Sequence, residues 1–375
     1  MLSYWEKTEM LEVDLLVLGG GITGMFCALT YRKQYPNARI AILERGLFPS
    51  GASTKNAGFA CFGSLTELIE DSETMGMEPM MDLVKLRIEG LALLRETLSD
   101  DAMEYQKYGG YELFFESHPK VFEKIDEVNT RLYNIFNQLI YSKKNNKIKS
   151  FGLDTKKVHH LIENPFEGQI HTGKMMAALK SLVVQNHISF YTQTEVKGYD
   201  FNPSINLLEV EIKEQRFKLQ TRKLALCTNA FTKHFYEETD LQPGRGMILV
   251  TKPIKNLQIK GAFHYNSGYY YFRNIEDRVL LGGGRELDFD SETTTAFGIN
   301  PIIKEKLNSD LRSFILPEQD FEIEMEWSGI MAFGTNKVPL IRKLDHHVAM
   351  GVRLGGMGIA IGSKVGQATA KLLFD

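Results

Sequence analysis

Three glycines near the start of the chain have the types and spacing of a phosphate-binding turn. Gly19, Gly21 and Gly24 form a G-x-G-x-x-G sequence directly after the apolar run Val13–Leu18, and the residues that follow, Ile22–Tyr35, have the length and apolar spacing of a helix. One glycine turns the chain tightly, one lets the backbone approach a pyrophosphate, and one lets the helix pack against the strand. The N-terminus of that helix offers unpaired N–H groups and a positive dipole end, which favour bound phosphates.

An acidic residue completes this motif. The expected second strand, Arg39–Leu43, ends on Glu44, which stands twenty residues after Gly24. A carboxylate at that place accepts hydrogen bonds from a ribose diol. Because strand, turn, helix, second strand and acid occur in register, the segment predicts a dinucleotide-binding unit rather than an ordinary tight turn.

The loop after Glu44 carries Arg45 and the sequence GASTKNAG at residues 51–58. Small residues let the backbone pass close to a flat ligand, and Ser53 and Asn56 can donate hydrogen bonds to phosphate or ring oxygens. A helix-capping loop is the plainer interpretation of the same residues. The position of this loop directly after the nucleotide-binding unit favours contact with a cofactor.

Length and composition limit the class of protein. A chain of 375 residues is too long for one simple core and predicts two intertwined domains. The formal net charge of −3, with 43% hydrophobic and 24% charged residues, is typical of a soluble globular protein and gives no reason to expect nucleic acid. The sequence predicts no signal peptide, and no apolar run approaches the ~18 residues that a membrane span needs.

The cysteines indicate the redox compartment. Cys27, Cys61 and Cys227 lie far apart and form no C-x-x-C sequence. They fit a reducing cytoplasm, and their spacing predicts neither a disulfide framework nor a cysteine-built metal site. We therefore expect a cytoplasmic protein without a metal.

The sequences GGGITG, LERG and GASTKNAGF together resemble the D-amino-acid-oxidase-like family of FAD-dependent oxidoreductases, which includes glycine oxidase, sarcosine oxidase, D-amino acid dehydrogenases and gamma-glutamylputrescine oxidase. The resemblance implies FAD rather than NAD, because the loop after the acidic residue runs under the flavin in that family. It implies an α/β fold, α+β overall, with a Rossmann-like FAD-binding domain and an interleaved antiparallel-sheet substrate domain. The FAD-binding domain would comprise residues 1–65, 150–235 and 325–375, and the substrate domain residues 66–149 and 236–324.

Later segments match the cofactor site of this family. Val196 matches a valine whose backbone contacts the adenine, and the small residues after Cys227 leave room for the pyrophosphate. The glycine-rich turn before the final helix, Ile359–Leu373, lies against the flavin in the family, where the helix dipole stabilises negative charge. No cysteine or histidine stands where covalently linked members have one, so we expect non-covalent FAD. The residues expected to bind it are Gly19, Gly21, Ile22, Thr23, Gly24, Glu44, Arg45, Ser53, Asn56, Ala57, Gly58, Val196, Thr228, Asn229, Ala230, Gly355, Gly356, Met357, Gly358 and Ile359.

The sequences GYYYFR at 268–273 and RVLLGGG at 278–284 predict adjacent strands with an aromatic wall. By position, Arg273 matches the arginine that holds the substrate carboxylate in glycine-oxidase-like members, and a surface salt bridge is the alternative. Tyr271 is its expected companion, because residues two apart share one face of a strand. The residues expected to act at the substrate are Arg273, Tyr271 and Trp327, and Arg353 near the flavin or substrate.

The sequence thus indicates a flavoenzyme that oxidises the C–N bond of a small amine or amino acid. In this hypothesis the amine binds neutral, a hydride passes to flavin N5 and the imine hydrolyses in water, so no dedicated protein base is required. The expected partners are the amine substrate and an electron acceptor, either oxygen or a quinone. Two alternatives stay open, an NAD-dependent dehydrogenase and a non-catalytic flavin-binding accessory protein.

Overall fold

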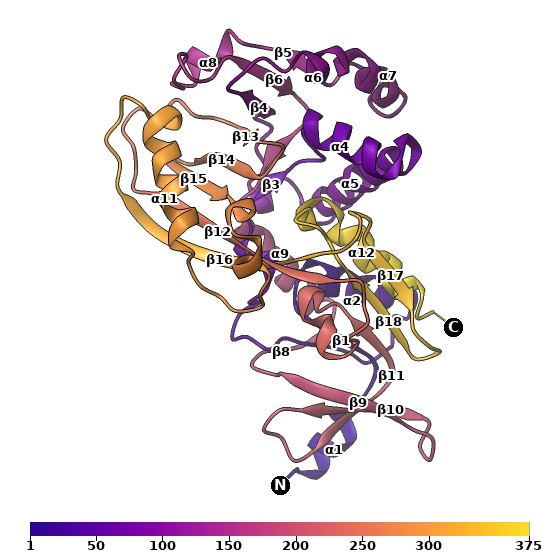
Figure 1. Ribbon diagram of the computed structural model, residues 1–375. Coiled ribbons are helices and arrows are strands. Elements are labelled where there is room, and N and C mark those ends of the chain that lie inside the picture. Colours follow the sequence, from indigo (N-terminus) through magenta and orange to yellow (C-terminus); the bar gives the residue numbers. More distant parts are fainter. Residues whose placement is uncertain (375) are drawn as a thin grey trace.

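The structure of the protein, a computed structural model, describes residues 1–374. In this part of the chain the strands form two eight-stranded sheets and one two-stranded sheet (Figure 1). The chain passes from one large sheet to the other several times, so neither sheet is built from one continuous segment. The mixed α/β class expected from the sequence is confirmed.

The first sheet has a parallel centre that begins with the N-terminal motif. β1 pairs in parallel with β2 on one side and with β11 on the other, and β8 and β18 extend the parallel arrangement outward. All of β2 is buried, as expected for a parallel strand covered on both faces. The strands of this sheet are β1 (Glu12–Leu18), β2 (Ile40–Leu43), β8 (Ser189–Tyr191), β9 (Val196–Asn202), β10 (Leu207–Ile212), β11 (Lys218–Leu226), β17 (Leu340–Lys343) and β18 (Val348–Val352).

Glycines let the helices beside this sheet approach one another closely. A Cβ on Gly366 would lie 2.3 Å from the carbonyl oxygen of Thr23, and a Cβ on Gly90 would lie 2.1 Å from that of Ala360. These contacts hold the last helix of the chain against the helix of the nucleotide motif and against the helix that contains Gly90. The helices concerned are α2 (Ile22–Gln34), α5 (Met77–Leu98) and α12 (Gly358–Lys371).

The second sheet is largely antiparallel and has two different faces. Along β12, Met247 and Leu249 belong to a core with stacked aromatic rings, whereas Ile248 packs with Tyr271 and Ala57 on the other face. This second face therefore meets the loop that follows the nucleotide motif. The strands are β4 (Gly110–Phe114), β5 (Ser142–Lys143), β6 (His160–Asn164), β12 (Gln242–Thr251), β13 (Ala262–Tyr265), β14 (Tyr270–Ile275), β15 (Arg278–Gly283) and β16 (Ile323–Phe333).

The strands of the two large sheets fall largely, but not entirely, in the residue ranges expected for the two domains. β6 and most of β16 lie in ranges expected for the FAD-binding domain, yet they pair with β4 and β12 in the second sheet. Both strands lie near expected boundaries, where the chain crosses between sheets. The division into domains stays a prediction.

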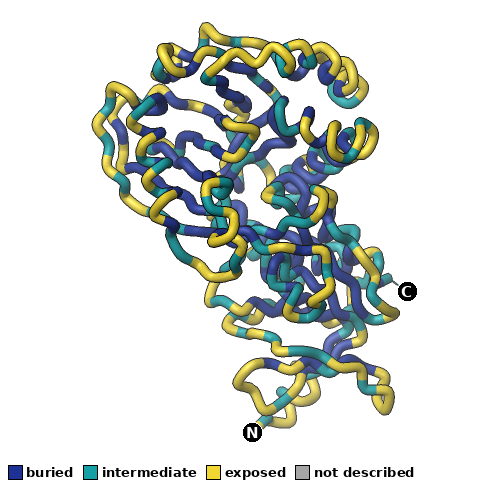
Figure 2. The backbone as a smooth tube through the Cα atoms, viewed as in Figure 1, coloured by how far each residue is buried: buried dark blue, intermediate teal, exposed yellow. Residues whose placement is uncertain are grey.

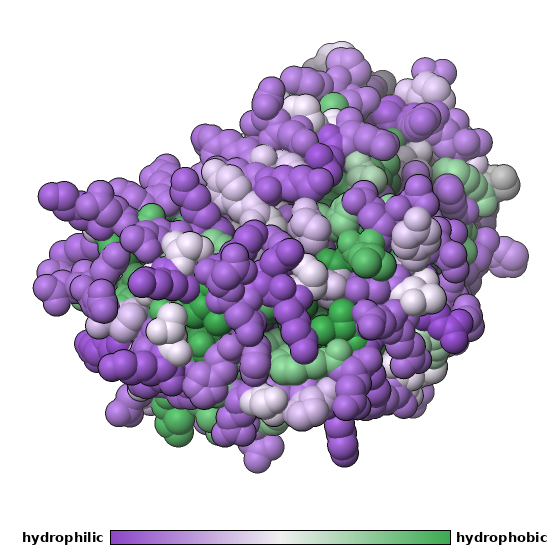
Figure 3. Space-filling view, turned by 90° about the horizontal axis from the view of Figure 1, so that it is seen from above, coloured by the Kyte–Doolittle hydropathy of each residue, from purple (hydrophilic) through white to green (hydrophobic). Residues whose placement is uncertain are grey.

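The remaining elements connect and cover the two large sheets. Buried backbone follows the strands, and exposed backbone concentrates in the peripheral loops (Figure 2). The face seen in Figure 3 is mostly hydrophilic, with hydrophobic residues grouped between the hydrophilic ones. Among residues 1–374, no helix combines the length and hydropathy of a membrane-spanning segment. These elements are α1 (Tyr4–Glu9), α3 (Ala52–Lys55), β3 (Phe59–Ala60), α4 (Leu65–Met75), α6 (Pro119–Glu123), α7 (Ile125–Phe136), α8 (Lys147–Ser150), β7 (Gly168–Gln169), α9 (Thr172–Gln185), α10 (Phe289–Glu292) and α11 (Pro301–Asp310).

Candidate cofactor and substrate site

A large cavity lies where the two sheets meet. Its volume is about 790 Å³, and its walls come from the end of β1, the start of α2, the loop after β2, strands β12 and β14, and the turn before α12. Cofactor and small-molecule sites typically measure roughly 300–1,000 Å³. The cavity is therefore of the size that a cofactor and a small substrate together require.

The glycine turn forms the first wall of the cavity. Gly19 has a φ of 107°, and a Cβ there would lie 2.5 Å from the carbonyl oxygen of Cys227, so a side chain is excluded. Gly24 does not line the cavity, because it packs α2 against β1, and its Cβ would lie 1.9 Å from the carbonyl oxygen of Gly19. The N-cap of α2 is Gly21, which provides no side-chain cap, while Ser53 Oγ accepts the Ile22 N–H at 3.0 Å. The start of α2 thus offers backbone donors to a phosphate.

Glu44 accepts hydrogen bonds from the surrounding backbone at the place expected for the ribose. Its side chain is buried at the end of β2, where Oε2 accepts the Gly20 N–H at 3.1 Å. Oε1 accepts the Gly46 N–H at 2.9 Å and the Ser50 hydroxyl at 3.0 Å. A carboxylate has about four lone-pair sites, so acceptor capacity remains for ribose hydroxyls.

The turn before α12 forms the opposite wall. Gly355 and Gly356 have φ values of 54° and 82°, and a Cβ on Gly355 would meet nothing within 4 Å, so the backbone there is open to a ligand. The N-cap of α12 is Met357, which also provides no side-chain cap. Two helix N-termini therefore border one cavity, and both favour negative charge.

These residues fit a flavin dinucleotide. Of the residues expected from the sequence to bind FAD, every one except Gly24 lines the cavity. The guanidinium of Arg45, on the same wall, lies 3.6 Å from the centre of the Phe231 ring. The start of α2 would hold the phosphates, Glu44 the ribose, and the α12 turn the flavin.

Arg353 does not line this cavity. Its guanidinium pairs with the Asp240 carboxylate, and it also donates to the Val338 carbonyl at 2.9 Å and to Asn336 Oδ1 at 3.1 Å. Its backbone N–H donates to Asn229 Oδ1 at 3.1 Å. Contrary to the expectation of contact with flavin or substrate, Arg353 positions the turn before α12 from outside the cavity.

Arg273 is also placed differently from the expectation. Its side chain is buried, with Nε 2.5 Å from the Ala57 carbonyl oxygen and Nη2 3.0 Å from that of Ile170. Burial lowers the pKa of Arg273 to about 10. Because these donors bind backbone carbonyls and Arg273 does not line the cavity, its side chain connects three segments and is not available to clamp a carboxylate.

The two aromatic residues expected at the substrate differ in position. Tyr271 lines the cavity, its ring meets Phe59 edge-to-face at 5.5 Å, and burial raises its pKa to about 12, so the phenol stays protonated. Trp327 does not line the cavity. Its Nε1 donates to the Lys55 carbonyl at 3.1 Å, which supports the loop from behind.

Two charged residues that line the cavity, Arg285 and Glu67, were not predicted from the sequence, and the part of the cavity that they border is called the substrate end below. Arg285 follows β15 and lines the cavity, with its guanidinium 4.1 Å from the centre of the Phe333 ring. Burial lowers the pKa of Arg285, and within residues 1–374 its guanidinium makes no ion pair. An arginine directly after three glycines at a strand end was the available signal.

Glu67 lines the same end from the first turn of α4. Oε2 accepts the Ser64 N–H at 3.0 Å in a capping box. Burial alone would raise the pKa of Glu67, but His264, Lys337 and Arg87, together with the Ser64 N–H, hold it below its ordinary value. Glu67 is therefore a carboxylate beside the cavity.

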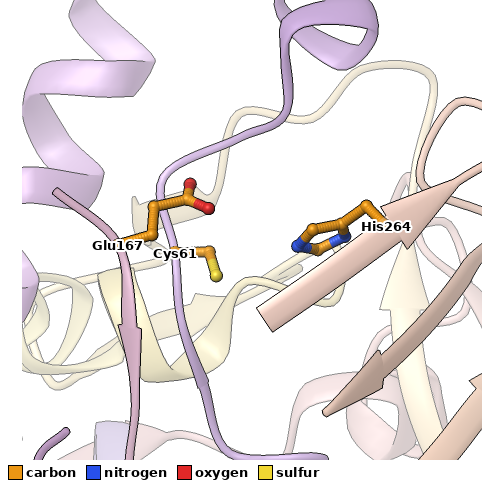
Figure 4. Close-up of side chains that lie close together, drawn as sticks. All are labelled: Cys61, Glu167 and His264. Atoms are coloured by element: carbon orange, nitrogen blue, oxygen red, sulfur yellow. The ribbon is translucent and has the colours of Figure 1, made fainter. Parts of the chain in front are cut away.

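Cys61, Glu167 and His264 lie close together at this end (Figure 4). Cys61 and His264 line the cavity, and Glu167 lies behind them. Burial raises the pKa of Glu167 to about 7, although the N–H groups of Phe62 and Gly63 oppose this rise. These titratable groups thus lie beside the carboxylate of Glu67.

Comparison with known proteins agrees with this geometry. The DAO family model, described as FAD dependent oxidoreductase, matches residues 14–372. Similar solved structures include glycine oxidase from Geobacillus kaustophilus, with a TM-score of 0.78, 17% identity, and coverage of 97% of this chain and 95% of that one. L-proline dehydrogenase from P. horikoshii has a TM-score of 0.76, 17% identity, and coverage of 96% and 93%. Iminodiacetate oxidase from Chelativorans sp. BNC1 has a TM-score of 0.76, 15% identity, and coverage of 96% and 95%.

At such identities these structures establish the fold alone. No curated protein matches the sequence. The family model, in contrast, spans almost the whole chain, and it agrees with a dinucleotide cradle built from the ends of β1 and β2. The chain therefore belongs to the DAO family and is an FAD-dependent oxidoreductase.

Proposed function

We propose that this flavoenzyme oxidises the C–N bond of a small amino acid or of a related amine that carries a carboxylate. The observation that carries the proposal is Arg285, a guanidinium on the cavity wall that makes no ion pair within the described residues. A partly buried cation without an internal partner favours an anionic ligand.

Arg285 would hold the substrate carboxylate. A guanidinium binds a carboxylate through two parallel N–H···O bonds, which fix both position and plane. The rings of Phe333 and Phe289, with centres 4.1 and 4.9 Å from the guanidinium carbon, support its orientation by cation–π contact. Arg285 thus takes over the role that the sequence suggested for Arg273.

Glu67 would attract the amino group of the substrate. A Cβ on Gly268 would lie 2.9 Å from the carboxyl carbon of Glu67, so this carboxylate borders the same turn that leads to Tyr269 in the cavity wall. Opposite charges on Glu67 and Arg285 would orient a zwitterion as it enters, and the ammonium proton would pass to solvent before the neutral amine is oxidised. The same pair would disfavour a substrate that carries only one of the two charges.

Apolar and aromatic side chains enclose the reacting carbon. Tyr271, Phe59, Ile248 and Met331 line the cavity between the charged residues and the cofactor cradle. They exclude water and so strengthen each polar contact with the substrate. Bound FAD supplies the two-electron oxidation, while the protein binds, orients and desolvates the amine.

We also propose the cofactor attachment, the electron acceptor and the location of the enzyme. The FAD family model does not favour the NAD-dependent alternative, and FAD without covalent attachment remains our expectation. Oxygen or a quinone would accept the electrons. Three free, buried cysteines support a reducing, cytoplasmic location, and the net charge of −3 supports no role in nucleic-acid binding.

An anaerobic screen tests this function. Purified, FAD-loaded protein is mixed with single amino acids and with the corresponding amines that lack the carboxylate, and flavin absorbance is followed. We expect one class of amino acid to bleach the flavin and its decarboxylated amine to do so weakly. Bleaching by none of these compounds would contradict the proposal and favour a non-catalytic flavin protein.

A further inference from the structure

Three different metal-binding groups meet beside the substrate end of the cavity. One ligand atom from each of Cys61, Glu167 and His264 lies within 4.8 Å of the other two (Figure 4). Cys61 follows β3, Glu167 directly precedes β7, and His264 lies on β13. The expectation of no metal came from the spacing of residues along the sequence. Such spacing cannot reveal a cluster that forms only when three distant segments meet in the fold.

His264 is the least satisfied member of this cluster. Its Nε2 is buried and makes no hydrogen bond with any described residue. In Figure 4 the imidazole extends from its strand toward Cys61 and Glu167. A buried ring nitrogen without a partner is unfavourable, and a cation shared with the two neighbouring groups would supply the missing partner.

Glu167 and Cys61 are held in place for such a role. Glu167 Oε1 accepts the N–H groups of Phe62 and Gly63 at 3.0 and 3.1 Å, which fixes the carboxylate. Cys61 Sγ lies 4.0 Å from the Gly168 carbonyl oxygen, at the outer limit of a sulfur hydrogen bond. Carboxylates oriented by backbone donors are typical of metal sites.

The three groups match zinc in charge and in the type of ligand atom. A thiolate and a carboxylate balance the charge of Zn²⁺, so a buried site with neutral imidazole is electrically neutral. Tetrahedral zinc ligands lie roughly 3.3–3.8 Å apart, given bonds of roughly 2.0–2.3 Å, so the three groups need to approach by about 1 Å. Thiolate and imidazole favour Zn²⁺ over Mg²⁺ or Ca²⁺, which prefer oxygen ligands.

We propose that Cys61, Glu167 and His264 form a zinc site with a fourth position that faces the cavity. Cys61 and His264 both line the cavity, so the fourth ligand would be water or an anionic group of a bound molecule. Binding releases to solvent the proton of the Cys61 thiol and any proton carried by the Glu167 carboxyl group. The ion would also tie together the segments after β3, before β7 and on β13 at the substrate end.

Metal analysis of the FAD-loaded protein tests the site. After incubation with zinc sulfate and gel filtration, we expect about one zinc per chain by elemental mass spectrometry. With Co²⁺ in place of Zn²⁺, we expect a thiolate-to-cobalt charge-transfer band. The His264→Gln variant should bind zinc at least about 100-fold more weakly, and the Cys61→Ser variant should lose the band.

The matched control is His171→Gln, which removes an exposed histidine at the N-cap of α9 and should leave zinc binding unchanged. Bound-flavin absorbance shows that each variant is folded. Equal zinc retention by His264→Gln and the wild type would overturn the proposal and identify adventitious surface zinc, as would wild-type protein that binds none. Because metal content is measured without turnover, neither outcome depends on the proposed amine oxidation.

Discussion

The two ends of the cavity are built in different ways. At the nucleotide end, the wall consists mainly of backbone groups. Glu44 accepts the Gly20 and Gly46 N–H groups, and all three residues lie in one short stretch of chain. At the substrate end, the cavity wall includes the side chains of Arg285, Glu67 and His264, which come from separate segments. Among the described residues, His264 Nε2 has no hydrogen-bond partner. Local sequence therefore determines the cofactor cradle, whereas tertiary packing assembles the proposed substrate end.

The largest expected effect is at the nucleotide end, in the variant Gly24→Ala. The added Cβ would lie 1.9 Å from the Gly19 carbonyl oxygen, so the turn must shift away from the phosphate position. Such overpacking costs about 3 kcal/mol, and we expect FAD affinity to fall about 100-fold or more. Flavin retained after gel filtration measures this loss.

Gly51→Ala is the matched control, because a Cβ there meets nothing within 4 Å although Gly51 lines the same cavity. It should retain FAD. Equal FAD retention by Gly24→Ala and Gly51→Ala would contradict the inference that close packing of the backbone shapes the nucleotide end of the cavity.

At the substrate end, Glu112 should make stability depend on pH. It is buried and accepts hydrogen bonds from the Thr66 N–H and hydroxyl, which hold the start of α4. Burial raises its pKa from 4.5 to about 7. Because the folded form holds the proton more tightly, this contribution is complete below pH 4.5 and is lost as pH rises through 7, by roughly 3 kcal/mol.

Denaturant unfolding of the wild type and of Glu112→Gln between pH 4.5 and 8 measures this dependence. The wild type should lose more stability than the variant as pH rises, since the amide does not titrate. Parallel curves would show that burial in the folded protein does not raise the pKa of Glu112.

Arg273→Gln should lower stability without changing substrate choice. Its loss leaves the carbonyls of Ala57 and Ile170 without their donor, and each unsatisfied buried carbonyl costs roughly 1–3 kcal/mol. We expect a lower unfolding midpoint and an unchanged preference for the amino acid over its amine. A stable variant that had lost this preference would restore the sequence-based role of Arg273.

The smallest effect is expected for Glu44→Gln. The amide keeps the shape and one acceptor oxygen but weakens charge-assisted bonds to N–H groups, which is worth about 1.4 kcal/mol, or roughly tenfold in FAD affinity. Flavin release on dilution measures this change. No change would imply that hydrogen bonds of Glu44 to Gly20 and Gly46 contribute little to the cradle.

The same contrast explains what the sequence could predict. The segment from β1 to Ala57 was predictable from the sequence. Its apolar periodicity, its glycine spacing and Glu44 all lie within one short stretch of chain. Strand alternation paired Tyr271 with Arg273, but only Tyr271 lines the cavity. Alternation could not show that the guanidinium of Arg273 would donate to the backbone carbonyls of Ala57 and Ile170. His264 and Glu167 carry no local signal in the sequence, because they come close to Cys61 only in the folded chain.

Arg285 is the residue that we propose recognises the substrate carboxylate. The most direct measurement compares anaerobic flavin reduction by an amino acid and by its decarboxylated amine, in the wild type and in Arg285→Gln. We predict that the wild type prefers the amino acid by about 100-fold, as expected for a charge-assisted bidentate pair worth about 3 kcal/mol, and that the variant shows almost no preference. An Arg285→Gln variant that reduces with undiminished preference for the amino acid would contradict this assignment.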